Sequence, residues 1–369
     1  MRLLIPRDRD HGWELIVRAC SEVGVEHQLF DIYGSDWIKQ AKAARADGCI
    51  YRAEFRHAPW RELFFERIRF LACNLGLPLY PRMHELELYE SKRRMAYWLQ
   101  AHAIPHPRTW VFGNKDEARD FLDRAPYPLI FKTDFGNASY GVRKIRNRTE
   151  AQRLWRRSFG NGYRVPYYRE GTLDAVNRFK AVVRPFYRRV KGIRHLPRDL
   201  ELDVMLFQEE VPIRHEWRLM KVGDSYFGKE KAMGHHGFHS GSDQMCWNIP
   251  PMQVFDLARQ VCTLGDFSTM SLDIFESDSG QFLVNELQTF FGSFNLKNQM
   301  YREEAGRWVG FRRYYDETAQ AWREELGEFC QNYCFNLRVL DFVKLLSVAS
   351  GVPANECRAS TPAATPLEN

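Results

Sequence analysis

Residues 270–288, MSLDIFESDSGQFLVNELQ, constrain the fold most, because they predict a β-hairpin that brings two carboxylates together. Two runs of β-forming residues flank SDSG, and we expect its last two residues to form the hairpin loop. Asp273 then lies opposite Glu286, and Gln288 lies two residues further along the same face. Like charges opposite one another destabilise a sheet, so we expect a cation between them, and hard oxygen ligands suit magnesium. The alternative is an acidic face that meets only water.

The size and charge of the chain limit the classes of function that it can have. Its 369 residues suffice for two or three packed subdomains, and its net charge of +6 suits phosphate or carboxylate ligands. That charge is too weak to indicate nucleic acid, which we do not expect as a partner. No stretch approaches the roughly 18 apolar residues of a membrane helix, and the start is not a secretory signal. We therefore expect a cytoplasmic protein without a membrane partner, and a homodimer by default.

Hydrophobic patterning predicts an α/β (α+β) fold class. The first eighty residues alternate short apolar runs with amphipathic stretches, which indicates a small parallel sheet with flanking helices. We expect one helix over 86–100, mainly strands over 108–150, and an irregular Arg- and Tyr-rich segment over 155–200. Strands follow residue 206, then a helix near 253–264 and a helical region over 302–348.

A second motif, IFKTDFGNASYGV at 130–142, is suited to binding phosphate. An apolar run ends in Lys132 and is followed by small residues, namely Gly136, Ala138, Ser139 and Gly141. Small residues let backbone N–H groups approach phosphate oxygens, and the lysine adds positive charge. The order of residues matches neither a P-loop nor a dinucleotide fingerprint. An ordinary hairpin turn is the alternative.

A third segment, residues 205–232, alternates apolar and charged positions on predicted strands. Its QEEV sequence followed by proline indicates an interdomain hinge whose backbone could contact an adenine edge. The charged positions are Glu209, Glu210, Glu216, Arg218, Lys229 and Lys231. Solvated strand charges are the alternative. Two neighbouring features stay open between a substrate role and a solvated loop: the histidines 235, 236 and 239, and the basic run 184–198.

In their order along the chain, these residues resemble the ATP-grasp enzymes over roughly residues 80–292. The segment YESKRRMAYWLQAHAIPHP, with Lys92 opening a helix, is similar to the D-alanyl-D-alanine and ribosomal-protein glutamate ligases. The stretch GHHGFHSGSDQ gives a closer likeness to ATP-grasp proteins associated with polysaccharide biosynthesis.

The resemblance implies a site for ATP and magnesium (Mg). Lys92 and Lys132 would bind the α- and β-phosphates, and the loop 135–141 would fold over the nucleotide. The other nucleotide contacts would come from Glu209, Glu210 and Val211 at adenine and from Glu216 at the ribose. Arg218 and one of Lys229 or Lys231 would lie near the transferring phosphate, Arg218 and Lys231 in catalytic roles. Asp273, Glu286 and Gln288 would ligate magnesium, although Gln288 stands where the family usually has Asn.

The same resemblance implies an N-terminal domain over 1–82 and two α+β subdomains that clamp the nucleotide. The first covers 83–207 and includes the basic insertion 155–200; the second covers 208–350 with the metal hairpin and a helical extension. Residues 351–369 would form a disordered tail. The expected activity is ATP-dependent ligation of a small carboxylate to an amine through an acyl phosphate. A phosphotransferase and a non-catalytic nucleotide- or polyanion-binding protein are the alternatives.

Overall fold

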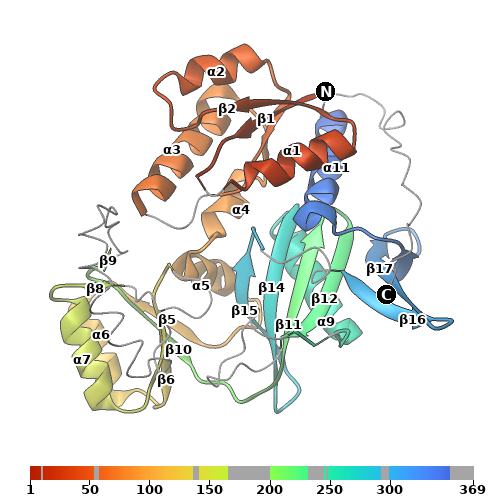
Figure 1. Ribbon diagram of the computed structural model, residues 1–369. Helices are drawn as coiled ribbons and strands as arrows, with labels where there is room; N and C mark the ends of the chain where they lie inside the picture. The colour runs from red at the N-terminus through yellow and green to blue at the C-terminus, as the bar shows by residue number, and fades with distance from the viewer. Residues whose placement is uncertain are drawn as a thin grey trace, which may run out of the picture.

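The computed structural model describes residues 1–9, 11–53, 58–135, 141–164, 200–231, 245–246, 248–291 and 299–349. The predicted histidine cluster, the basic run 184–198 and the tail from 351 lie outside these residues. Three main sheets form the architecture, with the N-terminal sheet above two antiparallel sheets in Figure 1. No helix in the described part of the chain is long and apolar enough to cross a membrane.

The N-terminal sheet is parallel, as predicted, with strand order β2-β1-β3-β4. Helices α2 and α3 cover one face, and α1 covers the other together with the C-terminal helix α11. The bounds are β1 Arg2–Pro6, α1 Trp13–Glu22, β2 Glu26–Phe30, α2 Trp37–Ala44, β3 Gly48–Ile50, α3 Ala58–Leu75, β4 Leu79–Tyr80 and α11 Gln331–Ala349. Gly48 leaves room for α11, because a Cβ atom there would lie 2.4 Å from Cζ of Phe342.

The second sheet is antiparallel with strand order β5-β10-β6-β7, and helices α6 and α7 pack on one face. Its elements are β5 Thr109–Phe112, α6 Lys115–Arg124, β6 Leu129–Lys132, β7 Val142–Ile145, α7 Arg148–Ser158 and β10 Met205–Glu209. A short ribbon of β8 Tyr163–Arg164 and β9 Leu200–Glu201 adjoins it. The expectation of strands over 108–150 missed α6 and the start of α7. Asn114 and Asn147 begin these helices as N-caps, their side chains accepting backbone N–H bonds.

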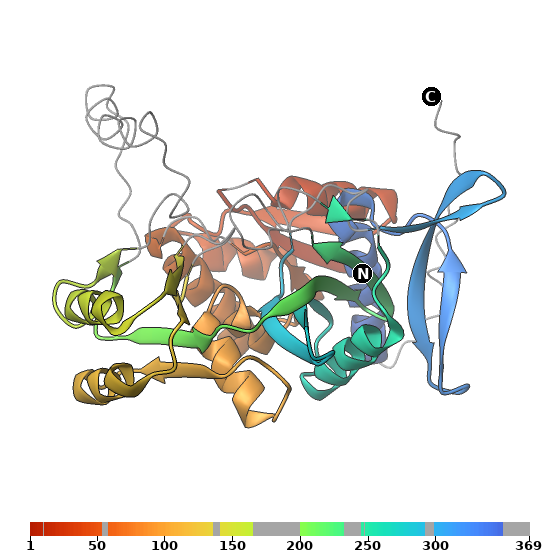
Figure 2. The same cartoon turned by 90° about the horizontal axis from the view of Figure 1, so that it is seen from below.

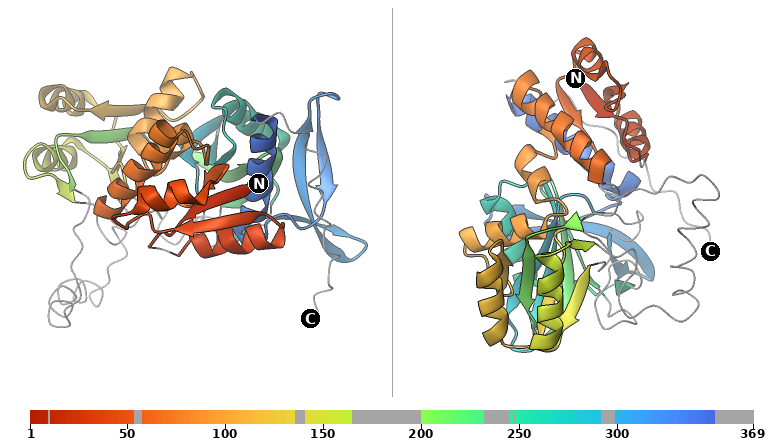
Figure 3. Two further views of the ribbon diagram at one scale, coloured as in Figure 1. Left: turned by 90° about the horizontal axis from the view of Figure 1, so that it is seen from above. Right: turned by 90° about the vertical axis from the view of Figure 1, so that its left-hand side faces the viewer.

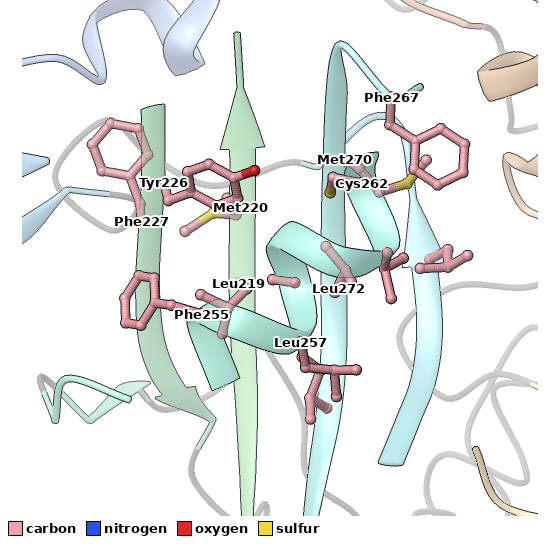
Figure 4. Close-up of a cluster of buried hydrophobic side chains, with 14 of the residues drawn as sticks. Leu219, Met220, Tyr226, Phe227, Phe255, Leu257, Cys262, Phe267, Met270 and Leu272 are labelled. Atoms are coloured by element: carbon pink, nitrogen blue, oxygen red, sulfur yellow. The ribbon is translucent and has the colours of Figure 1, made fainter. Parts of the chain in front are cut away.

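The third sheet carries the predicted hairpin, and α9 covers one of its faces. The main path of strands is β15-β14-β11-β12-β17-β16, with β13 beside β12 and β18 beside β17. Figure 4 shows Phe255, Leu257 and Cys262 of α9 packing against Leu219 and Leu272 of the strands. The bounds are β11 Ile213–Val222, β12 Ser225–Lys231, β13 Met245–Cys246, α9 Met252–Leu264, β14 Thr269–Ser277, β15 Phe282–Gln288, β16 Met300–Glu304, β17 Arg307–Asp316 and β18 Ala321–Leu326.

Two expectations about helices are wrong. The helix predicted over 86–100 is divided into α4 Met83–Leu88 and α5 Lys92–Ala101, because Glu90 has a φ of 54° and Ser91 caps α5. The region 302–326 forms strands β16 to β18, which project from the body in Figure 2, and only α11 is helical. Turn residues explain this correction: Ala305 and Gly306 both have positive φ and close a hairpin.

The packing of α9 gives the first prediction. Leu272 is 0% exposed and belongs to the core under α9, whereas Leu264, at the end of the same helix, is 49% exposed. We expect Leu272→Ala to lower the free energy of unfolding by about 3 kcal/mol, because it removes buried methyl groups and leaves a cavity. Leu264→Ala should change it by less than about 0.5 kcal/mol. Urea denaturation checks both, and equal losses would contradict this assignment of the core.

Candidate functional site

A cleft runs between the second and third sheets, with α5 along one side. The two sheets are joined by residues 210–212, between the end of β10 at Glu209 and the start of β11 at Ile213, so the QEEV sequence, predicted as an interdomain hinge, lies partly in β10 and partly in this connection. The apolar walls are formed by Met95, Leu99, Ile130, Val142, Leu206 and Phe275. At the inner end the lining is polar: Lys92, Lys132, Glu216, Lys231, Asn285 and Glu286.

The connector residues also line the cleft. Glu209 accepts a hydrogen bond from the backbone N–H of Arg108 at 2.6 Å, and Glu210 pairs with Lys144 at 2.6 Å. Glu209, Glu210 and Val211 all border the cleft.

Two predicted lysines meet at the inner end of the cleft. Lys132 is the last residue of β6, and its Nζ donates to Oδ1 of Asn285 at 2.9 Å. Lys92 opens α5, and its backbone N–H donates to the Asp134 carbonyl at 3.2 Å. Burial lowers the pKa of Lys132 to about 8; Glu286 opposes this shift and the Lys92 charge adds to it. An anion near Lys132 would therefore favour its protonated form.

The residues at the two ends of the small-residue loop, Asp134 and Gly141, make close contacts with the surrounding structure. Gly141 has a φ of 81°, and a Cβ atom there would lie 1.9 Å from Oγ1 of Thr133, so glycine is required. Asp134 accepts from the backbone N–H of Arg93 at 2.8 Å and donates its own N–H to Glu201 on β9 at 2.5 Å. Gly136, Ala138 and Ser139 lie outside the described residues.

The charged residues of the third sheet share the face opposite α9. Lys229, Arg218, Asp273 and Glu286 are neighbours across β12, β11, β14 and β15, in that order. Arg218 forms a bidentate pair with Asp273, with Nε–Oδ1 at 2.7 Å and Nη2–Oδ2 at 2.8 Å. Lys231 pairs with both Glu216 and Asp273, at 2.9 Å from the latter. The negative charge of Asp273 is therefore neutralised by the side chains of Arg218 and Lys231.

These pairs shift the pKa values of the site in opposite directions. Burial would raise the pKa of Asp273, but Arg218 and Lys231 outweigh it and hold that pKa well below its usual range. For Lys229, burial and the adjacent Arg218 outweigh the opposing effect of Asp273 and lower its pKa to about 7. The face thus carries an ionised aspartate and a lysine that titrates near neutrality.

The donor set of the hairpin fits a magnesium ion. Gln288 donates from Nε2 to Glu286 at 2.8 Å, and its buried Oε1 has no hydrogen-bond partner among the described residues. An amide oxygen of this kind, next to a carboxylate, is a hard ligand of the type that magnesium prefers. No group of three or more His, Cys, Asp or Glu side chains in the described ranges would hold a metal unaided. Substrate phosphates would have to complete the coordination.

The predicted pairing of the two carboxylates is confirmed, although the predicted turn is wrong. Asp273 does lie opposite Glu286, but the hairpin closes between Ser277 and Gln281 over three residues. A bulge at Asn285 compensates for the additional loop residue and restores the pairing. The bulge also places Asn285 beside Glu286 in the cleft, where strict alternation would put it on the opposite face. No pattern in the sequence therefore indicates that Asn285 faces the cleft.

The Asp273 pairs give the second prediction. Asp273→Asn leaves Arg218 without its carboxylate and Lys231 paired with Glu216 alone, so we expect a loss of about 3–5 kcal/mol in the free energy of unfolding. The exposed Asp278→Asn in the same hairpin is the control and should be nearly neutral. Because the pKa of Asp273 is lowered from 3.8, the wild-type advantage is present above that pH and declines as acid protonates the group. Denaturation at several pH values checks this, and a constant difference would contradict it.

Comparisons with known proteins establish the fold. No protein-family model and no curated protein sequence matches the chain. D-cycloserine synthetase DcsG is similar in structure, with a TM-score of 0.56, 16% identity, and coverage of 94% of this chain and 100% of that one. D-alanine–D-alanine ligase from Bacillus anthracis, complexed with ATP, has a TM-score of 0.54, 12% identity, and coverage of 95% and 99%. The ATP-grasp fold that the sequence resemblance implied is confirmed.

Proposed function

We propose that this chain is an ATP-dependent, magnesium-requiring ligase that joins a small carboxylate to an amine. The main support is the combination of an apolar cleft with buried lysine and carboxylate side chains at its inner end, beside the Arg218–Asp273 ion pair. The cleft walls suit adenine, and the 209–211 backbone suits its polar edge. Lys92 and Lys132 at the inner end suit the phosphates. The ligases that share the fold are consistent with this proposal.

The remaining residues have roles that follow from their positions. Glu216 would take the ribose hydroxyls, with Lys231 holding its carboxylate in place. Asp273, Glu286 and Gln288 would hold magnesium, which when bound would neutralise charge on the phosphates. Arg218 and Lys231 would stabilise the charge that develops as the γ-phosphoryl group moves, because both are fixed before the reaction by Asp273.

The proposed reaction has two steps. A carboxylate oxygen of the acid attacks the γ-phosphorus of ATP, and ADP leaves, which gives an acyl phosphate. The nitrogen of the amine then attacks the acyl carbon, loses a proton and expels inorganic phosphate, which gives the amide. A cleft that excludes water would protect the acyl phosphate between the steps.

An isotope experiment tests the proposed chemistry. The protein is incubated with ATP, magnesium, and panels of acids and amines, and ADP release identifies an active pair. The acid is then labelled with heavy oxygen in its carboxylate. We expect one labelled oxygen to appear in inorganic phosphate, together with an amide whose mass equals acid plus amine minus water.

Two variants and one rival outcome complete this test. Glu286→Gln should reduce turnover by about 100-fold or more through loss of a metal ligand and its outer contacts. Asp278→Asn, on the same hairpin but exposed, should keep wild-type turnover. A stable phosphorylated alcohol, with no label in inorganic phosphate, would show a phosphotransferase and overturn the ligase proposal.

The pKa of Lys132 gives a prediction about nucleotide binding. Its ammonium form is favoured by phosphate, so ATP binding should take up a proton where the free group, with a pKa of about 8, is neutral. We expect the affinity for ATP to fall by up to about tenfold per pH unit above that value. Lys132→Arg keeps its charge throughout and should flatten this dependence. Calorimetry in buffers of different ionisation enthalpy measures the proton uptake, and equal heats would contradict the prediction.

A further inference from the structure

Arg338 on α11 is a buried cation whose hydrogen-bonding capacity is unmet. Its side chain is 2% exposed, and its Nε and Nη2 atoms have no hydrogen-bond partner in the part of the chain that the structure describes. Buried donors are nearly always paired, and a buried charge is normally paired as well. An arginine in this state is therefore expected to serve something other than the packing of its own helix.

Aromatic rings surround the Arg338 guanidinium without giving it an acceptor. Its central carbon lies 4.5 Å from the ring centroid of Phe291, 4.9 Å from Phe335 and 5.9 Å from Phe290. Such contacts stabilise a cation by attraction to the ring face. They leave the in-plane N–H groups unsatisfied, because those groups need an oxygen in the plane of the guanidinium.

The neighbouring carboxylates are already engaged. Glu85 accepts from the backbone N–H groups of Thr269 at 2.9 Å and Arg82 at 2.7 Å, and Asp341 accepts from the Tyr80 hydroxyl at 3.0 Å. Burial lowers the pKa of Arg338 and Arg52 acts in the same direction, whereas Cys334, Tyr80 and Glu85 oppose the shift. The carboxylates of Glu85 and Asp341 thus accept from donors other than Arg338.

Arg338 is connected to the hairpin strand β15 through the two phenylalanine rings, Phe290 and Phe291, that its guanidinium contacts. Phe290 and Phe291 follow Gln288, the last residue of the hairpin strand β15, so their Cα atoms lie within about 7–10 Å of its Cα atom. Cys334, four residues before Arg338, influences the pKa of both Arg338 and Lys229, so it lies near both side chains. Figures 1 and 3 show α11 between the N-terminal sheet and the third sheet.

The Arg218–Asp273 pair in the same molecule shows which kind of acceptor fits the unpaired edge of Arg338. Arg218 uses its Nε and Nη2 atoms to hold the two oxygens of Asp273. The same edge, Nε with Nη2, is the unpaired one in Arg338. A carboxylate matches this edge with two parallel hydrogen bonds, which a monodentate acceptor cannot form.

We propose that Arg338 anchors a second carboxylate of the acid substrate, so that the substrate is a dicarboxylic acid. One carboxylate is bound by the guanidinium edge of Arg338, and the other, several bonds away, reaches the reacting face near Glu286 and Gln288. This assignment rests on the proposed function, since it names the acid that the ligase would activate. Arg338 is a binding and specificity residue that takes no part in phosphoryl transfer.

Binding of glutarate, a dicarboxylate, and butyrate, a monocarboxylate of similar length, tests the proposal in the full chain without ATP. Calorimetry should show glutarate binding more tightly, and Arg338→Met should weaken glutarate by about 10- to 100-fold while leaving butyrate unchanged. Methionine keeps much of the apolar volume, and replacing a buried charge in this way is often tolerated. Arg338→Lys should also lose most of the preference, because an ammonium cannot form the bidentate pair.

Arg259→Met is the matched control. Arg259, on α9, also has a buried Nε without a partner among the described residues, but its central carbon lies 3.7 Å from the ring centroid of Tyr315, at a pocket separate from the cleft. It should bind glutarate as the wild type does. Equal glutarate binding by Arg338→Met, Arg338→Lys and wild type would overturn the proposal and leave Arg338 as a structural cation. If inorganic phosphate displaces glutarate more strongly than butyrate displaces glutarate, the substrate carries a phosphate group. That result would also overturn the dicarboxylate proposal.

A turnover measurement separates this inference from the proposed function. With a dicarboxylic acid found active in the panel, Arg338→Met should raise KM for that acid and leave KM for ATP within about twofold. If glutarate binds through Arg338 and no acid supports ADP release, the ligase proposal fails and the binding site stands. If amides form and KM for the acid does not change in Arg338→Met, the binding site fails and the ligase stands.

Discussion

The pairing of Asp273 with Arg218 and Lys231 is the interaction on which the rest of the structure depends. It links β14, β11 and β12 through buried charges, and it fixes which residues of these strands share a face. A shift of one residue in any of the three strands would separate the charges and turn the apolar side chains away from α9. The core under α9 and the charged face of the cleft are therefore two consequences of a single register.

The same interaction explains how a densely charged face is stable before any nucleotide binds. Asp273 and Glu216 satisfy Arg218 and Lys231 within the protein, so the site needs no ion to fold. Lys132 and Lys229 lack this degree of compensation, and burial lowers the pKa of each. The positive charge of Lys229 is thus lost as the pH rises through about 7 and that of Lys132 as it rises through about 8, and a nearby phosphate would favour the charged form of each. This arrangement favours the binding of anionic ligands and does not require the folded protein to bury unpaired cations when no ligand is bound.

The sequence predicted those parts of the site that follow from local periodicity. Alternation within 270–288 gave the Asp273–Glu286 pairing, and it did so despite the wrong loop, because the bulge at Asn285 cancelled the error. The bulge itself has no local signature, so Asn285 was missed. The segment 302–326 was misassigned because arginine and aromatic residues suit helices and exposed strands alike, and only pairing with β12 decides between them.

The proposed binding role of Arg338 could not be predicted from the sequence, for a different reason. On a helical pattern it is one basic residue among apolar ones, and its significance arises only when α11 packs against residues far away in the chain. Phe335, Val339 and Phe342 of this helix enter the same core as Leu3 and Ile5 of the first strand. The energy that docks α11 thus comes from burying these apolar side chains, and the position of Arg338 follows from that docking. Because this packing stabilises the docked helix, the guanidinium of Arg338 need not add to the free energy of folding. A buried arginine can be retained for binding a ligand under this condition.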